Sequence, residues 1–242
     1  MVPGGFEALS EARAARARLL AERYPASRDV LSFVAEIAAL QGAVATRAAS
    51  FEALVGLREP LLAVVRMSGP EALRTAADGL DDSALRAALI AYRDRSDTSS
   101  LRSFFARVLL QTFAAASPSG AAAGERSCPR CGHRPQVGVL RAQGHGNALS
   151  LVCSLCLHEW PFGRGQCAAC GAESTSLAYY TADELPHLRV HACDSCKRYL
   201  HAVDLAAEPD AIADVDELVA LPLDVWARER DYAKLQPNLA GI

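Results

Sequence analysis

The residues of this chain whose types and spacing could do chemistry are its eight cysteines. They fall into four Cys-x-x-Cys pairs: Cys128 and Cys131, Cys153 and Cys156, Cys167 and Cys170, and Cys193 and Cys196. Thiolate sulfur is a preferred ligand of zinc and of iron–sulfur centres, and two such pairs supply a complete tetrahedral set. The spacing therefore predicts two metal sites with four cysteine ligands each, which leaves no open position for catalysis.

The lengths between the pairs indicate how they combine. Separations of 21, 10 and 22 residues give two tandem units, offset by 39 residues at their first pairs and 40 at their second, as in an internal duplication. Sequential pairing, first with second and third with fourth, is favoured because each couple encloses its own hairpin. A crossed pairing, first with third and second with fourth, stays open. Four thiolates suit zinc or rubredoxin-type iron equally, so spacing does not choose the metal.

Short strands and turns must position these cysteines. Alternating and β-branched residues predict the strands that follow: 137–141, 148–152, 157–162, 177–181, 188–191 and 199–203. Residues 143–147 have a composition suited to a hairpin turn. Gly132 and Gly171 directly follow the second cysteine of each opening pair, where a positive φ is expected. A ribbon of about 40 residues buries too little surface to fold alone, so its metal should contribute about 10 kcal/mol or more.

The first half of the chain has a different, helical pattern. Apolar residues recur at three-and-four spacing over 28–44 and again over 101–113, which predicts two amphipathic core helices. Pro70 suits the first position of another helix, and Ser83 suits the cap of the next. The stretch 117–126, SPSGAAAGER, breaks this pattern before the first cysteine pair.

These observations predict an α+β chain: an N-terminal all-α helical domain, two tandem rubredoxin-like or zinc-ribbon modules that each bind a metal through four cysteines, and a short C-terminal helical tail. The expected bounds are 1–120 for the helical domain, 121–127 for a linker, 128–163 and 164–205 for the two ribbons, and 206–242 for the tail.

Composition narrows the class of function. The chain has 242 residues, 51% of them hydrophobic and 22% charged, with a net charge of −3. The ribbon region 128–205 carries 7 basic and 6 acidic residues, which is not the basic footprint of a nucleic-acid binder. Charged residues interrupt any secretory leader, and the longest strongly apolar run, 61–65, is too short to span a membrane, so we expect a cytoplasmic protein without membrane insertion. The sequence has no catalytic constellation and no dinucleotide or phosphate loop, so we expect neither enzyme activity nor an organic cofactor.

The cysteine motifs also carry a family resemblance. They read Cys128-Pro-Arg-Cys131-Gly132, Cys153-Ser-Leu-Cys156 leading into Trp160, Cys167-Ala-Ala-Cys170-Gly171, and Cys193-Asp-Ser-Cys196-Lys197, and the tail has Leu221, Asp224, Trp226 and Tyr232-Ala-Lys234-Leu235 before Asn238-Leu239. Behind a helical first half, this order resembles the formate dehydrogenase accessory protein FdhE family.

The resemblance implies a cytoplasmic accessory protein without catalytic turnover. Such a protein would bind the molybdenum- or tungsten-containing catalytic subunit of a respiratory formate dehydrogenase and support its maturation before twin-arginine export. The family is associated with rubredoxin-like iron, which places iron ahead of zinc. Two other functions stay open: a rubredoxin-like redox or electron-transfer protein, and a zinc-ribbon nucleic-acid-binding protein. The sequence also leaves a homodimer open.

Overall fold

The chain divides into two compact units, one up to residue 118 and the other from 119 to Asn238. The structure, a computed structural model, describes residues 5–96, 100–116, 124–144, 146–239 and 241. Residues 117–123, which include the first part of the expected linker 121–127, lie outside the described residues, and the predicted domain bounds stay predictions.

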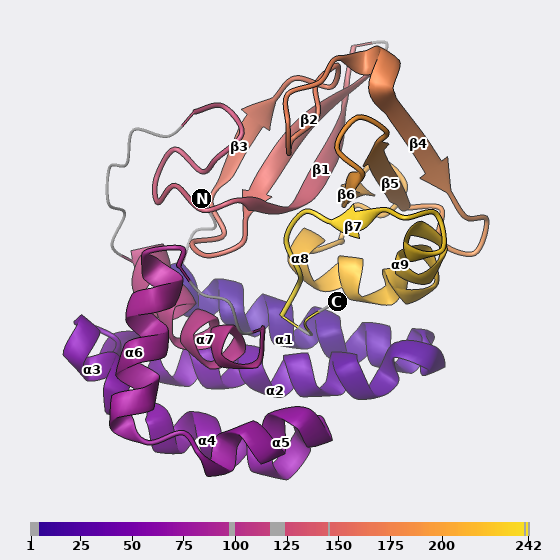
Figure 1. The fold of residues 1–242 in the computed structure, drawn as a ribbon. Coiled ribbons are helices and arrows are strands. Elements are labelled where there is room, and N and C mark those ends of the chain that lie inside the picture. The colour runs from indigo at the N-terminus through magenta and orange to yellow at the C-terminus, as the bar shows by residue number, and fades with distance from the viewer. Residues whose placement is uncertain (1–4, 97–99, 117–123, 145, 240, 242) are drawn as a thin grey trace. The chain divides into compact units, whose positions relative to one another are not determined.

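The first unit is a bundle of α-helices (Figure 1). Its helices are α1 Gly5–Arg23, α2 Arg28–Val44, α3 Phe51–Val55, α4 Arg58–Ser68, α5 Glu71–Asp78, α6 Asp82–Arg93 and α7 Ser100–Ala116. Helices α2 and α7 agree with the periodic runs found in the sequence.

The core of this bundle is apolar and also contains a buried polar network. Leu31 and Ile37 of α2 are buried, and Phe33 stacks on Phe104 of α7 with ring centroids 5.7 Å apart. Arg13 of α1 is also buried, and its guanidinium donates to the Gln41 side chain at 2.7 Å. This hydrogen bond lowers the cost of burying a charge inside a helical core.

One segment of the described residues, Pro25–Arg47, is long and apolar enough to cross a membrane by length and composition alone. A single such helix is weak evidence, because core helices of globular proteins pass the same test. Most of this segment is the predicted core helix 28–44. Its helix α2 packs its apolar face against α1, α4 and α7.

Two predicted helix starts need correction. Pro70 is the residue before α5 and not its first helical position. The cap of α6 is Asp81, whose carboxylate accepts from the Ala84 backbone N–H at 2.7 Å, whereas Ser83 lies inside the helix. A carboxylate is favoured at a helix N-terminus because it satisfies a free N–H and also opposes the positive end of the helix dipole.

Among its described residues, the second unit is built on one sheet of seven strands. The strands are β1 Pro135–Gln143, β2 Gly146–Cys153, β3 Glu159–Phe162, β4 Leu177–Thr181, β5 Leu188–Cys193, β6 Arg198–Asp204 and β7 Ala233–Lys234. Six of them lie in the order β3-β2-β1-β6-β5-β4, and β7 pairs with β6 (Figure 1). The six predicted strands are present, some with their bounds moved by a few residues.

The two ribbons share this sheet through a parallel pairing of β1 with β6. The pairing runs from Val137 opposite His201 to Leu140 opposite Asp204. Gly138 allows the close approach, since a Cβ there would lie 3.0 Å from Leu149 Cδ1 and 3.2 Å from the Cβ of its partner Ala202. The fold class is confirmed: a helical region precedes a sheet region with two four-cysteine clusters and a C-terminal helix.

The tail covers the junction of the two ribbons. It contains α8 Ala213–Asp216, the 3-10 helix η4 Glu217–Ala220 and α9 Leu221–Arg228. Helix α8 packs on β1 and β6, and Val215 and Leu218 of this part of the tail are buried. The tail is not only helical, as its last element, β7, joins the sheet beside β6.

Candidate metal centre

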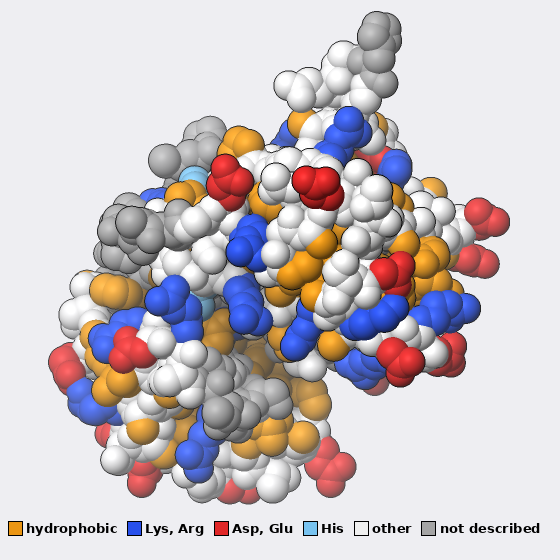
Figure 2. Space-filling view, turned by 45° about the horizontal axis from the view of Figure 1, so that its top comes forward, with side chains coloured by type: hydrophobic (Ala, Val, Ile, Leu, Met, Phe, Trp, Pro, Cys, Tyr) orange, Lys and Arg blue, Asp and Glu red, His pale blue; other side chains and the backbone are white. Residues whose placement is uncertain are grey.

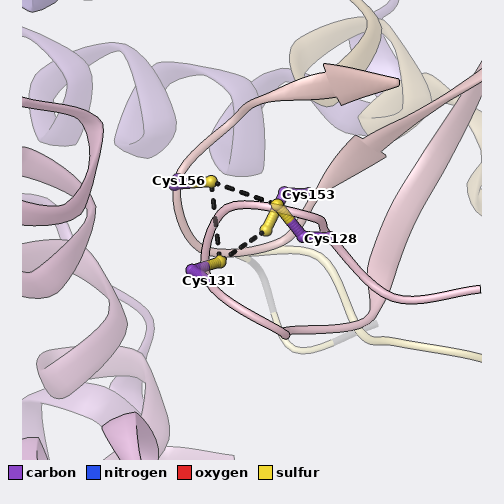
Figure 3. A group of neighbouring side chains, drawn as sticks. All are labelled: Cys128, Cys131, Cys153 and Cys156. Carbon is purple, nitrogen blue, oxygen red and sulfur yellow. Dashed lines mark hydrogen bonds between the residues drawn. The ribbon is translucent and has the colours of Figure 1, made fainter. Parts of the chain in front are cut away.

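The first two cysteine pairs converge on one point in the sheet unit (Figure 3). Cys128 and Cys131 lie before β1, Cys153 ends β2, and Cys156 lies in the turn before β3. The Sγ atoms of Cys128 and Cys156 are 3.5 Å apart, and Cys131 Sγ lies 3.3 Å from that of Cys153 and 3.5 Å from that of Cys156. Figure 3 shows all four sulfurs directed toward one another.

The third and fourth pairs form a second cluster of the same kind. The Sγ atoms of Cys167 and Cys196 are 3.8 Å apart, as are those of Cys170 and Cys193. A metal–sulfur bond of about 2.3 Å puts the sulfurs of a regular tetrahedron about 3.8 Å apart. The donor set and spacing of the second cluster therefore fit a tetrahedral zinc or iron ion, and the first cluster is slightly more compact.

Sequence reasoning selected all eight of these residues, and the structure brings them together by sequential pairing. The crossed pairing is not found. In each cluster every ligand atom lies within 4.8 Å of the others, so either cluster could hold a metal ion. Among the described residues, no histidine belongs to a metal-ligating group of this kind.

The backbone builds the four cysteine pairs from one repeated turn. In the opening pairs, the Cys128 N–H donates to the His133 carbonyl and the Cys167 N–H donates to the Ala172 carbonyl, at 2.9 and 2.8 Å. Backbone N–H groups also reach the sulfurs, as from Ala169 to Cys167 Sγ at 3.3 Å. Such donors favour the thiolate over the thiol.

A left-handed residue closes each of these turns. The predicted positive φ is present at Gly132 and Gly171, at 75° and 83°. The same position in the other two pairs holds Leu157 and Lys197, with φ of 55° and 53°. A side chain in this conformation costs about 1 kcal/mol relative to glycine, so glycine is favourable here but not required.

We expect Gly171→Ala to lower the free energy of unfolding of the sheet unit by about 1 kcal/mol, because alanine must adopt a positive φ there. A clash does not add to this cost, since the new Cβ would be 3.6 Å from the Arg126 guanidinium. Urea unfolding with the metal retained measures the effect. Gly163→Ala is the matched control, because that glycine has open space and no positive φ. Equal losses in the two variants would contradict this explanation.

Electrostatics also favours a bound cation. The sulfurs of the first cluster perturb one another, and contact with Cys128 lowers the pKa of the Cys131 thiol while raising that of Cys153. Four thiolates at these separations would repel strongly at neutral pH. A divalent or trivalent ion removes that repulsion, which is why such clusters bind metals as thiolates.

Sequence reasoning missed a second group of buried polar residues, which we call the buried charge cluster: His201, Glu217, Asp224 and Lys234. The Lys234 ammonium lies 3.3 Å from Glu217 Oε2 and 3.4 Å from Asp224 Oδ1. His201 Nε2 is 3.3 Å from Asp224 Oδ1, to which the Tyr199 hydroxyl donates at 2.6 Å. All four side chains are at most 5% exposed. The cluster joins β6 to β7 and to the helical part of the tail.

A signal for this cluster was present in the sequence. Lys234 is one of only two lysines in the chain, and Asp224 interrupts the apolar run Leu-Pro-Leu-Asp-Val-Trp. Both belong to the tail motif that carries the family resemblance, but their pattern does not indicate which residues they meet. Contact required the tail to fold over β6.

The cluster makes stability depend on pH through Glu217. Burial raises the pKa of this carboxyl from an ordinary 4.5 to about 7, although Lys234 and a hydrogen bond from Gln136 oppose the shift. The folded state therefore holds the proton more tightly than the unfolded state. This contribution is fully present below about pH 4.5 and is lost as the pH rises through about 7. Burial instead lowers the pKa of His201, whose contribution has the opposite sign.

We expect Glu217→Gln to flatten the loss of stability between pH 5 and pH 8, because glutamine resembles the protonated carboxyl and does not titrate. Between pH 5 and pH 8, the free energy of unfolding of the natural protein should fall by about 1 to 3 kcal/mol more than that of the variant. Urea unfolding of both proteins at several pH values gives the difference. His201, Asp224 and Lys234 face Glu217 in both proteins, so parallel curves would mean that Glu217 is not the titrating group.

Three comparisons with known proteins bear on this site. Residues 166–240 match the family model "FdhE, C-terminal domain". The chain is 33% identical over 116 residues to "Protein FdhE homolog" of Aquifex aeolicus, and 38% identical over 119 residues to that of Pseudomonas aeruginosa. These alignments cover 47% and 46% of this chain, but only 41% and 38% of the two relatives, so the matched part spans about two fifths of their length.

The fold is similar to a solved structure over a longer range. The crystal structure of the FdhE protein from Pseudomonas aeruginosa aligns with a TM-score of 0.76 and 26% identity. The alignment covers 97% of this chain and 95% of that one.

Proposed function

We propose that the chain belongs to the FdhE family, since residues 166–240 match its C-terminal domain and the fold is similar to that of an FdhE protein, and that it is an accessory protein of formate dehydrogenase. It binds the catalytic subunit of a respiratory formate dehydrogenase in the cytoplasm and supports maturation of that subunit before export. The observation that carries the proposal is the family match at the second cysteine cluster and the tail.

Each cysteine cluster holds one metal ion, iron or zinc, in this proposal. The ligands are the eight cysteines, four to a site: Cys128, Cys131, Cys153 and Cys156, then Cys167, Cys170, Cys193 and Cys196. The metal supplies folding free energy to a unit whose ribbons are too small to fold alone. Four protein sulfurs complete a tetrahedral shell, which supports a structural rather than a catalytic role.

The alternative of a nucleic-acid-binding ribbon receives little support. Acidic side chains lie among the basic ones on the face in view in Figure 2. Within the sheet unit, Arg189 pairs with Asp204 at 2.5 Å and Lys197 pairs with Asp194 at 2.6 Å, which neutralises part of the positive charge. Nucleic acid is held mainly by a continuous basic surface. Steep salt-dependent binding of the purified chain to DNA or RNA would revive this alternative.

Deletion of the gene tests the accessory role. We expect the deletion strain to lose respiratory formate dehydrogenase activity while still making the catalytic polypeptide, and a plasmid copy of the natural gene to restore activity. A tagged chain should also retain the immature catalytic subunit when purified from the restored strain. Normal formate dehydrogenase activity in the deletion strain would contradict the proposal.

The redox alternative has a direct optical test. Anaerobically purified protein with rubredoxin-type iron should absorb in the visible range and bleach reversibly with reductant. A colourless protein with two zinc ions would eliminate electron transfer and leave the accessory role intact.

A further inference from the structure

The two cysteine clusters differ in how far solvent reaches them. In the first, Cys128, Cys153 and Cys156 are 0, 0 and 4% exposed. In the second, Cys170 is exposed and Cys196 is half-buried. The outer edge of the second cluster is therefore open to a reagent, while the first is open only at the half-buried Cys131.

The residues inside the closing pairs explain part of this difference. Ser154 and Leu155, between Cys153 and Cys156, are 1% and 4% exposed, so they cover the first cluster with packed protein. The equivalent residues of the second cluster, Asp194 and Ser195, are exposed. Asp194 instead pairs with the Lys197 ammonium at 2.6 Å, on the surface. With two exposed polar residues in place of two buried ones, the outer edge of the second cluster is less covered than the first cluster.

A small pocket lies beside the two buried thiols of the second cluster. Its wall includes the inner thiols Cys167 and Cys193, together with Leu177, His191 and Leu200. This pocket has room for little more than a water molecule, so an entering thiol reaches the metal site from the side of the exposed Cys170.

We propose that the second cluster is the site at which this protein exchanges its metal and reacts with thiols, with Cys170 as the ligand that leaves. The first cluster keeps its metal and maintains the sheet. Soft thiols are the class of incoming ligand, since they compete best for a metal held by thiolates. This inference depends on the clusters holding metal and not on the formate dehydrogenase role.

The exchange step is a ligand substitution without oxidation. The entering thiol gives up its proton, and its sulfur bonds to the metal. The bond from the metal to Cys170 Sγ breaks, and Cys170 takes up a proton. The charge and oxidation state of the metal do not change, so no oxidant or reductant is needed.

Arg126 restrains the loop that carries the leaving ligand. Its Nη1 donates to the Ala169 carbonyl at 2.9 Å, and its guanidinium lies against Gly171 on the other side of Cys170. Loss of this contact should allow the loop to open more often and speed the departure of Cys170.

The experiment uses the full chain loaded with zinc and treated with N-ethylmaleimide. Metal release is followed with a chromophoric chelator, and alkylated cysteines are mapped by mass spectrometry at each time. We expect one zinc ion to leave at least about tenfold faster than the other, with Cys170 and Cys196 labelled in the fast phase. Glutathione in place of maleimide should accelerate only the fast phase.

Two outcomes would overturn the proposal. One is labelling of the first cluster at the same rate as the second, or before it. The other is a chain that binds fewer than two zinc ions before the reagent is added. Neither depends on a partner, so a failure here is distinct from a failure of the accessory role.

A pair of arginine variants sharpens the test without removing a ligand. Arg126→Ala should raise the rate of the fast phase several-fold and leave the slow phase unchanged. Arg134→Ala is the control, since Arg134 is an exposed arginine three residues after Cys131 of the first cluster. If Arg126→Ala accelerated the slow phase instead, the fast phase would not come from the second cluster, and the proposal would be wrong.

Discussion

Cys153→Ser is expected to lose one of two metal ions and to unfold the sheet around the first cluster. Cys153 is fully buried at the end of β2, and its Sγ atom lies 3.3 Å from that of Cys131. A serine hydroxyl is a poor replacement for a thiolate ligand. Because structural metal sites contribute about 10 kcal/mol or more, we expect the free energy of unfolding to fall by about 5 to 10 kcal/mol. Metal analysis and urea unfolding by circular dichroism measure the two effects.

The control for this variant is Ser195→Ala, which changes an exposed hydroxyl inside another cysteine pair. It should keep both metals and the stability of the natural protein. Helices of the first unit should still fold in Cys153→Ser, so part of the helical signal should remain. Retention of two metal ions by Cys153→Ser would show that the cluster does not need this sulfur.

The next largest effect is expected from Lys234→Met in the buried charge cluster. Methionine has a similar length, but it removes the ammonium that lies 3.3 Å from Glu217 and 3.4 Å from Asp224. Two buried carboxylates then face each other without a cation, which costs about 3 to 5 kcal/mol. The loss should be smaller at low pH, where Glu217 takes up a proton. Urea unfolding at pH 5 and pH 8 measures both the loss and its pH dependence.

The other lysine of the chain is the matched control. Lys197 makes an ion pair of 2.6 Å with Asp194, but both side chains are more than half exposed. We expect Lys197→Met to leave the stability unchanged within error, since water screens exposed pairs. Equal losses from the two lysine variants would indicate a general effect of net charge instead of the buried contacts.

Much of this fold could be predicted from local patterns. Helix α2 and strand β4 agree with the predicted ranges, because an amphipathic stripe and a run of alternating residues are set within a few turns of the chain. Both four-cysteine sets could also be assigned, since the spacing of a Cys-x-x-Cys pair is itself local. Helix α1 was not singled out, because Arg13 and Arg16 occupy positions on its buried side.

Contacts between distant segments could not be predicted. The pairing of β1 with β6 places Val137 opposite His201. The alternation of apolar residues in each strand does not indicate which other strand it pairs with. The buried charge cluster was missed for a related reason. Charged residues are normally exposed, and they are buried here because Glu217, Asp224 and Lys234 meet one another under the tail.

The order of the strands has a consequence for self-association. The first three strands lie in the order β3-β2-β1 and the next three in the order β6-β5-β4. The first strand of one ribbon, β1, therefore pairs with the last strand of the other, β6, in a head-to-tail contact. A head-to-tail contact does not close on itself. Among the described strands, the outer edges of the sheet are again a last strand, β3, and a first strand, β4. A third ribbon from another copy could therefore extend the row. Pro161 in the short strand β3 opposes this growth, because it offers no N–H to an added strand.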